Sequence, residues 1–69
     1  MRIMKTENGQ VYLEVGDVVE DSLTGTELTI LDIFDRDGVR LVELTDWRGS
    51  STTTVPGYLR VPKRIKIKN

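Results

Sequence analysis

The sequence contains no cysteine, no histidine and no alanine among its 69 residues. Without cysteine the chain cannot form a disulfide or a thiolate zinc cluster, and without histidine it lacks a common metal ligand and the commonest general base. A domain this short buries only about 60% of the surface that its unfolded chain exposes. Packing or a partner subunit must therefore stabilise it. We expect no metal and no cofactor.

Long apolar runs are also missing, so no segment is predicted to span a membrane. The N-terminus lacks the apolar segment of a signal peptide. A small secreted domain would more often carry disulfides, which favours the cytoplasm for this chain. We expect a soluble, unprocessed protein with no membrane partner.

Residues that favour strands are abundant. Val, Ile and Thr together supply 21 residues, and β-branched side chains pack well on a pleated sheet but lose rotamer freedom in a helix. The composition therefore predicts an all-β chain. Turn signals recur at intervals of roughly ten residues, as in small barrels and sandwiches. They are Asn8-Gly9, Gly16-Asp17, Thr24-Gly25, Asp37-Gly38, Arg48-Gly49 and Pro56-Gly57.

Two of these signals predict hairpins. Asn8-Gly9 lies between two short apolar segments and predicts an N-terminal hairpin over residues 1–14, because both residues accept positive φ. Asp37-Gly38 separates the two longest strand candidates, 27–34 and 39–45, which we expect at the centre of the sheet.

The first of these central strands does not alternate regularly between apolar and polar residues. This pattern predicts either burial on both sides or a bulge near Asp32 that exchanges the two faces. Leu28, Ile30 and Phe34 fall on one face, and Leu31 and Ile33 fall on the other.

The C-terminal part contains two further strand candidates. Residues 51–55 form the first, and Pro56-Gly57 ends it. Residues 63–68 form the second, in which Ile65 and Ile67 share one face and basic residues occupy the other. We expect this last strand to have a basic outer face.

The order of these elements resembles that of the SH3-like small β-barrels, which have five or six short strands and a one-turn 3₁₀ helix before the last strand. Residues 13–17 look like the element that opens the strand series, and residues 55–59 look like the segment with the short helix. The resemblance covers about residues 13–67 and implies a single domain over 1–69, with a hairpin at 1–14 and a barrel at 15–69 closed by Ile65 and Ile67.

The resemblance does not extend to the ligand groove of peptide-binding SH3 domains. Those domains carry a Trp just after the central hairpin turn and a Tyr in the 3₁₀ segment. Tyr58 matches the second position, but Val39 and Arg40 stand where the Trp is expected. We therefore do not expect binding of proline-rich peptides, and the resemblance leaves the partner open.

Charge divides along the sequence. Residues 1–46 contain all eleven acidic side chains and carry a formal charge of −7, whereas residues 47–69 carry +6, for a net charge of −1. Cations near aromatic rings suit either protein or nucleic-acid partners. The candidate site, which we call the basic-aromatic surface, consists of Trp47, Arg48, Tyr58, Arg60, Lys63, Arg64, Lys66 and Lys68.

Several interpretations of this surface stay open. In one, the basic residues protect an exposed edge strand from aggregation; in another, they pair with the acidic strands. Trp47 lies between Asp46 and Arg48 at the tip of a predicted hairpin, which favours exposure and a role in an interface. The acidic pair Asp35 and Asp37 fits a turn better than a catalytic site.

These observations predict a non-enzymatic binding module of a bacterial or phage-type regulatory kind. A protein partner is the first hypothesis, with a homodimer through an edge strand as a special case. Binding of single-stranded DNA or RNA is the alternative, and a minor structural or catalytic role within a larger assembly is the third.

Overall fold

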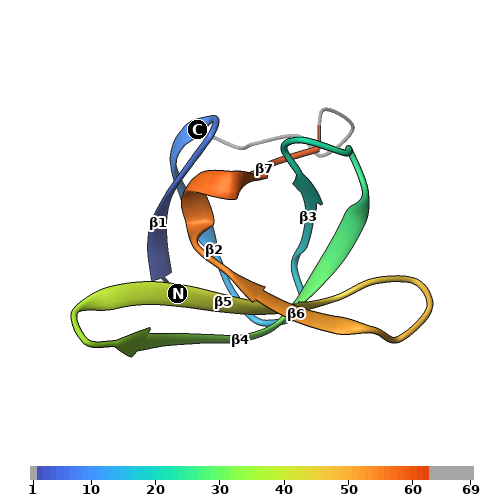
Figure 1. Ribbon diagram of the computed structural model, residues 1–69. Helices are drawn as coiled ribbons and strands as arrows, with labels where there is room; N and C mark the ends of the chain where they lie inside the picture. Colours follow the sequence, from blue (N-terminus) through green and yellow to red (C-terminus); the bar gives the residue numbers. More distant parts are fainter. Residues whose placement is uncertain (1, 63–69) are drawn as a thin grey trace.

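The computed structural model describes residues 2–62 and shows an all-β fold with two antiparallel sheets and one short 3₁₀ turn (Figure 1). β1 and β2 form the smaller sheet, and the larger one has the strand order β6-β5-β4-β3-β7. The prediction of an all-β chain is therefore confirmed. The elements are β1 (Arg2–Thr6), β2 (Gly9–Leu13), β3 (Val18–Asp21), β4 (Glu27–Arg36), β5 (Val39–Thr45), β6 (Ser51–Thr54), η1 (Pro56–Tyr58) and β7 (Leu59–Arg60).

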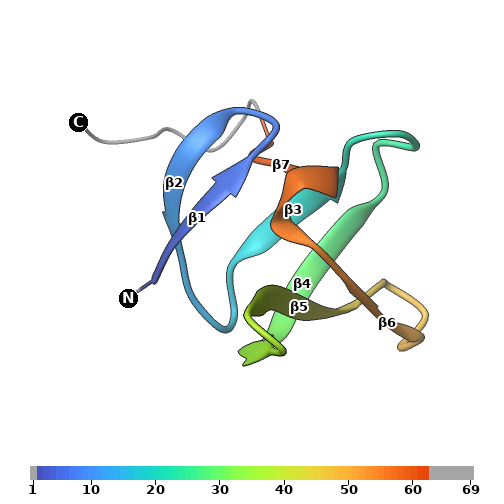
Figure 2. The ribbon, with the colours of Figure 1, turned by 60° about the vertical axis from the view of Figure 1, so that its left-hand side comes forward.

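Within residues 2–62, hydrogen bonding does not close the two sheets into a barrel, contrary to the sequence-based expectation. The β1–β2 hairpin reaches the larger sheet at its turn, where Glu7 N–H donates to Leu59 O over 2.9 Å, but it forms no strand ladder with that sheet. Figure 2 shows this hairpin standing beside β7. The strand predicted over 63–68, which was expected to close the barrel, lies outside the described residues.

The N-terminal hairpin forms where it was predicted, but its turn differs in detail. Thr6 pairs with Gly9, so Glu7 and Asn8 make the turn. The positive φ falls on Gly9, at 92°, and not on Asn8. Thr6 Oγ1 fixes this geometry, because it accepts a hydrogen bond from Asn8 N–H and donates one to Gly9 O. The side chain of Thr6 thus replaces the left-handed Asn that the sequence suggested.

The central hairpin has the predicted two-residue turn. Arg36 pairs with Val39, and both Asp37 and Gly38 have positive φ, at 53° and 78°. This combination matches the right-handed twist of the flanking strands. β4 and β5 occupy the inner positions of the larger sheet, as expected.

A β-bulge explains the irregular apolar pattern of β4. Ile30 pairs with Leu44 and Asp32 pairs with Glu43, so Leu31 is the extra residue. The bulge exchanges the faces of the strand, since Ile30 and Ile33 are both buried while Leu31 is exposed. The sequence left open burial on both sides or a bulge, and the structure shows the bulge.

Nine apolar side chains from both sheets form the core. Every strand except β6 contributes one to three of them, and the single Trp and both Tyr lie outside. The core therefore contains only aliphatic and Met side chains. Its members are Met4, Leu13, Val19, Leu28, Ile30, Ile33, Val42, Leu44 and Leu59.

Truncation of this small core tests the fold directly. Leu44 is fully buried opposite Ile30, so Leu44→Ala should lower the free energy of unfolding by about 2–5 kcal/mol. A domain of this size has only about 3–10 kcal/mol in total, so much of that variant should be unfolded at 25 °C. Urea denaturation followed by circular dichroism measures the change.

Leu23→Ala is the matched control, because Leu23 has the same side chain but is 88% exposed. It should change the free energy of unfolding by no more than about 0.5 kcal/mol. Equal effects of the two substitutions would contradict the described core.

Candidate binding surface

Trp47 lies in the loop of residues 46–50 that joins β5 to β6, and its side chain is 84% exposed. Arg48 stacks on it, with the guanidinium carbon 5.3 Å from the centre of the indole ring. The sequence favoured exposure of this residue, and the structure confirms it. A large aromatic ring and a cation, which also lies 3.9 Å from Asp46 Oδ2, thus project together from the end of a hairpin.

Asp46 holds this loop in one conformation. Its Oδ1 accepts hydrogen bonds from the backbone N–H groups of Arg48 and Ser50, at 2.9 and 3.0 Å. Asp46 N–H donates to Ser50 O, and Gly49 N–H donates to Asp46 O. Gly49 has a φ of 85°, which a residue with a Cβ adopts at a cost. The loop therefore presents Trp47 and Arg48 from a defined backbone.

Tyr58 is the second exposed aromatic residue of the predicted surface, at 59% exposed. Its backbone is fixed from both sides, because its N–H donates to Val55 O and its carbonyl accepts a hydrogen bond from Ser22 N–H. Pro56, at the start of η1, is buried. The 3₁₀ turn is thus anchored in the protein while the ring of Tyr58 faces solvent.

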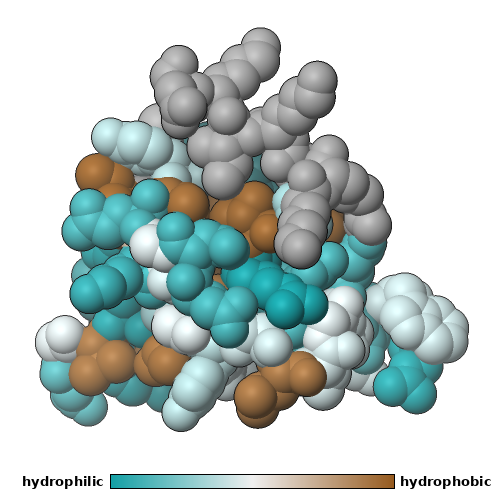
Figure 3. All heavy atoms as spheres, turned by 90° about the horizontal axis from the view of Figure 1, so that it is seen from above, coloured by the Kyte–Doolittle hydropathy of each residue, from teal (hydrophilic) through white to brown (hydrophobic). Residues whose placement is uncertain are grey.

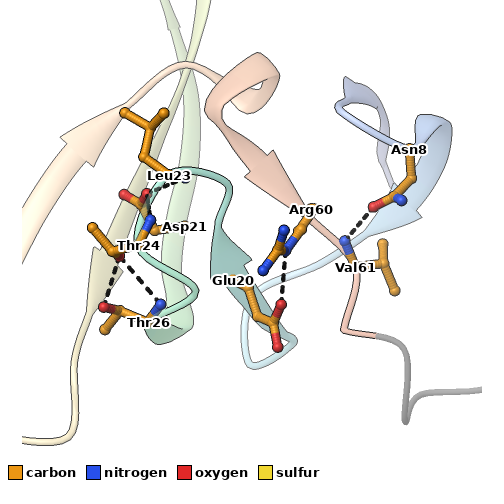
Figure 4. Close-up of polar contacts among 8 residues, drawn as sticks. All are labelled: Asn8, Glu20, Asp21, Leu23, Thr24, Thr26, Arg60 and Val61. Atoms are coloured by element: carbon orange, nitrogen blue, oxygen red, sulfur yellow. Dashed lines mark hydrogen bonds and ion pairs between the residues drawn. The ribbon is translucent and has the colours of Figure 1, made fainter.

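Arg60 follows on β7, but its guanidinium already has a partner. Arg60 Nε donates to Glu20 Oε1 over 2.9 Å, across the β3–β7 pair (Figure 4). This contact is one of the acidic-to-basic pairs between strands that the sequence allowed as an alternative to partner binding. Arg60 therefore contributes less to a recognition surface than a free cation would.

The structure separates the described members of the basic-aromatic surface into two groups. Trp47 and Arg48 lie before β6, whereas Tyr58 and Arg60 lie after it. Figure 1 shows the β5–β6 loop projecting away from η1 and β7. Within one molecule, β6 therefore keeps the two groups apart. The remaining members Lys63, Arg64, Lys66 and Lys68 lie outside the described residues.

Leu23 is an exposed residue that the sequence did not single out. It occupies the β3–β4 turn, where Asp21 Oδ1 accepts hydrogen bonds from the N–H groups of Leu23 and Thr24 (Figure 4). Thr24-Gly25 marked this turn in the sequence, but a turn signal does not tell which apolar side chain faces water. Figure 3 shows apolar atoms scattered among polar ones on the face seen from above.

The acidic pair considered for catalysis is part of the central hairpin. Asp35 forms an ion pair with Arg40, in which Nε donates to Oδ1 over 2.9 Å, and Asp37 makes the turn. The hydrogen bond and charge of Asp35 raise the pKa of Arg40 above its usual value. These contacts support the turn interpretation of the sequence.

Residues 2–62 offer neither a cluster of metal-binding acids nor a helix that could cross a membrane. No group of three or more Asp and Glu side chains is placed to hold a metal ion in this part of the chain. Over the same residues, no helix has the length and apolar character needed to cross a membrane.

Comparisons with known proteins do not identify a family for the chain. No protein-family model, no curated protein and no solved structure matches it.

The exposure of Trp47 can be tested by fluorescence, because it is the only Trp in the chain. Iodide should quench the emission of the folded protein nearly as strongly as that of the urea-unfolded protein, since the ring is open to solvent. Quenching several-fold weaker in the folded state would show that the ring is covered and would contradict the described loop.

Proposed function

We propose that the chain is a non-enzymatic binding module that engages a protein partner through Trp47 and Arg48, supported by Tyr58. The observation that carries this proposal is the exposed Trp47, stacked by Arg48 on a loop that Asp46 fixes. Trp and Arg are enriched at the centres of protein interfaces. An aromatic ring held in place before binding loses little conformational entropy when a partner covers it.

We further propose that the fold is an open relative of the SH3-like small barrels. Two features support this idea: a larger sheet of five antiparallel strands, and the 3₁₀ turn η1 directly before the last described strand β7. Tyr58 lies in that turn, at the place where the resemblance expects an aromatic residue. Fold alone does not define a ligand, so the function rests on the exposed side chains.

Nucleic-acid binding is the second candidate, and the charge division of the sequence is the observation that favours it. Residues 63–69 carry four basic and no acidic side chains. Residues 2–62, however, contain six basic against eleven acidic side chains, a balance of −5, and three of their arginines are paired with acids. An acidic body repels phosphates, so a protein partner is the stronger proposal.

Site-specific variants test the protein partner. Each protein is immobilised and exposed to extract of its source cells, and the bound proteins are quantified by mass spectrometry. Trp47→Ala should reduce the recovery of the specific partner by about 30-fold, as expected for an interface residue worth about 2 kcal/mol. Asp46→Ala should weaken recovery less, because it loosens the loop but keeps the ring.

Leu23→Ala serves as the control, since it removes an equally exposed apolar side chain from a different turn. Its recovery should equal that of the unmodified protein. If Trp47→Ala and Leu23→Ala recover the same proteins in the same amounts, the proposed role of Trp47 is wrong.

An oligonucleotide titration tests the second candidate. Short single- and double-stranded oligonucleotides are added at two salt concentrations while Trp47 emission and fluorescence anisotropy of the labelled oligonucleotide are followed. We expect no binding at physiological salt. Binding whose logarithm falls linearly with the logarithm of salt would instead support nucleic-acid recognition.

A further inference from the structure

The two edges of the larger sheet differ in how they are protected. β7 has two residues, carries the paired Arg60 and is followed by Pro62, and the β1–β2 turn bonds to its Leu59 O and to Val61 N–H. Short length, charge and proline are the usual devices that prevent edge strands from pairing with other chains. The β7 edge is therefore protected against pairing with a strand of another chain.

The β6 edge is less protected: it is twice as long as β7 and has no charged residue, although Pro56 follows it as Pro62 follows β7. β6 reads Ser-Thr-Thr-Thr, with no charge and no proline, and three of its four residues are exposed. It pairs with β5 on one side, and Figure 2 shows no described segment along its other side. Threonine has high β-propensity, so the strand is a good template for a further strand.

The alternation of antiparallel pairing tells which backbone groups of β6 point outward. Arg36 and Val39 flank the tight turn, so Val39, Leu41 and Glu43 bond to β4, and Val42 and Leu44 bond toward β6. The bond from Asp46 N–H to Ser50 O continues the same alternation. Thr52 and Thr54, opposite Leu44 and Val42, therefore bond to β5. The N–H and C=O groups of Ser51 and Thr53 point away from the sheet.

We propose that β6 pairs with β6 of a second copy of this chain, antiparallel and about a twofold axis at Thr52. In this register Ser51 of each copy lies opposite Thr53 of the other. All four outward groups of each strand are then paired, in four intermolecular hydrogen bonds. In the neighbouring symmetric register, about Thr53, fewer outward groups can form intermolecular hydrogen bonds, because Val55 O already accepts one from Tyr58 N–H.

A second copy fits this edge better than a charged peptide for three reasons. The strand is uncharged, so self-pairing brings no like charges together at the axis. A twofold interface requires a self-complementary surface, which the spacing of Ser51 and Thr53 provides. A single domain of 69 residues with a small core also gains stability from association.

The pairing has a consequence for the proposed binding surface. Because the strands run in opposite directions, the 46–50 loop of one copy lies at the same end as η1 of the other. Trp47 and Arg48 of one molecule are thereby brought toward Tyr58 of its partner, which a single molecule keeps apart. The dimer itself does not depend on the proposed function, whereas this composite surface rests on it.

Sedimentation equilibrium over a range of protein concentrations tests the dimer. The interface is small for a stable complex, so we expect the mass to rise from 7.8 kDa toward twice that value as concentration increases through the micromolar to millimolar range. A mass of 7.8 kDa at every concentration would overturn the proposal.

Two variants and a control locate the interface. Thr52→Lys places like charges at the twofold axis, and Thr53→Pro removes an outward N–H without touching the bonds to β5. Each should weaken association at least tenfold while the circular dichroism spectrum keeps its strand signal. Gln10→Lys adds the same charge at an exposed position of β2 and should associate like the unmodified protein. Unchanged association in both β6 variants would overturn the proposal.

Amide hydrogen exchange gives a residue-level measurement that does not rely on variants. Exchange at Ser51 and Thr53 should slow at least tenfold between dilute and concentrated protein, whereas Thr52 and Thr54, already bonded to β5, should change little. Equal slowing at all four amides, or none at Ser51 and Thr53, would overturn the register. Loss of the dimer with intact partner recovery would leave the proposed function standing, so the two failures can be told apart.

Discussion

The pairing of β4 with β5 is the interaction on which the rest of the structure depends. Asp37 and Gly38 set its register, because their two positive φ values give a two-residue turn whose twist matches that of the flanking strands. The bulge at Leu31 then turns Ile30 and Ile33 into the same core. β3 and β6 are added to this hairpin on either side, and the positions of Trp47 and of the β6 edge follow from its register.

Local signals in the sequence predicted much of this arrangement. Asp37-Gly38 identified the central hairpin, the broken alternation of β4 indicated its bulge, and the position of Trp47 between Asp46 and Arg48 indicated exposure. Each of these features depends on residues that are neighbours in sequence. The N-terminal hairpin was also predicted, although Thr6 rather than a left-handed Asn8 fixes its turn.

Features that depend on distant residues were not predictable in the same way. The ion pair of Arg60 with Glu20 joins residues forty positions apart, and it removes a cation that the sequence assigned to recognition. Closure of the sheets into a barrel also depends on long-range pairing, and the described residues leave β6 unpaired on one side. Nothing in the pattern Ser-Thr-Thr-Thr tells whether its strand is central or at an edge. Among the described residues, the candidate site that the charge division suggested is therefore reduced to a few residues around an exposed aromatic ring.

The central claim is that the β5–β6 loop contacts another molecule through Trp47. Photo-crosslinking with benzoylphenylalanine at position 47, and at position 23 as control, tests it most directly when the products are mapped by mass spectrometry. Intermolecular products are expected from position 47, to a partner protein or to the η1 region of a second copy, and few from position 23. Equal yields from both positions, or only intramolecular products from position 47, would contradict it.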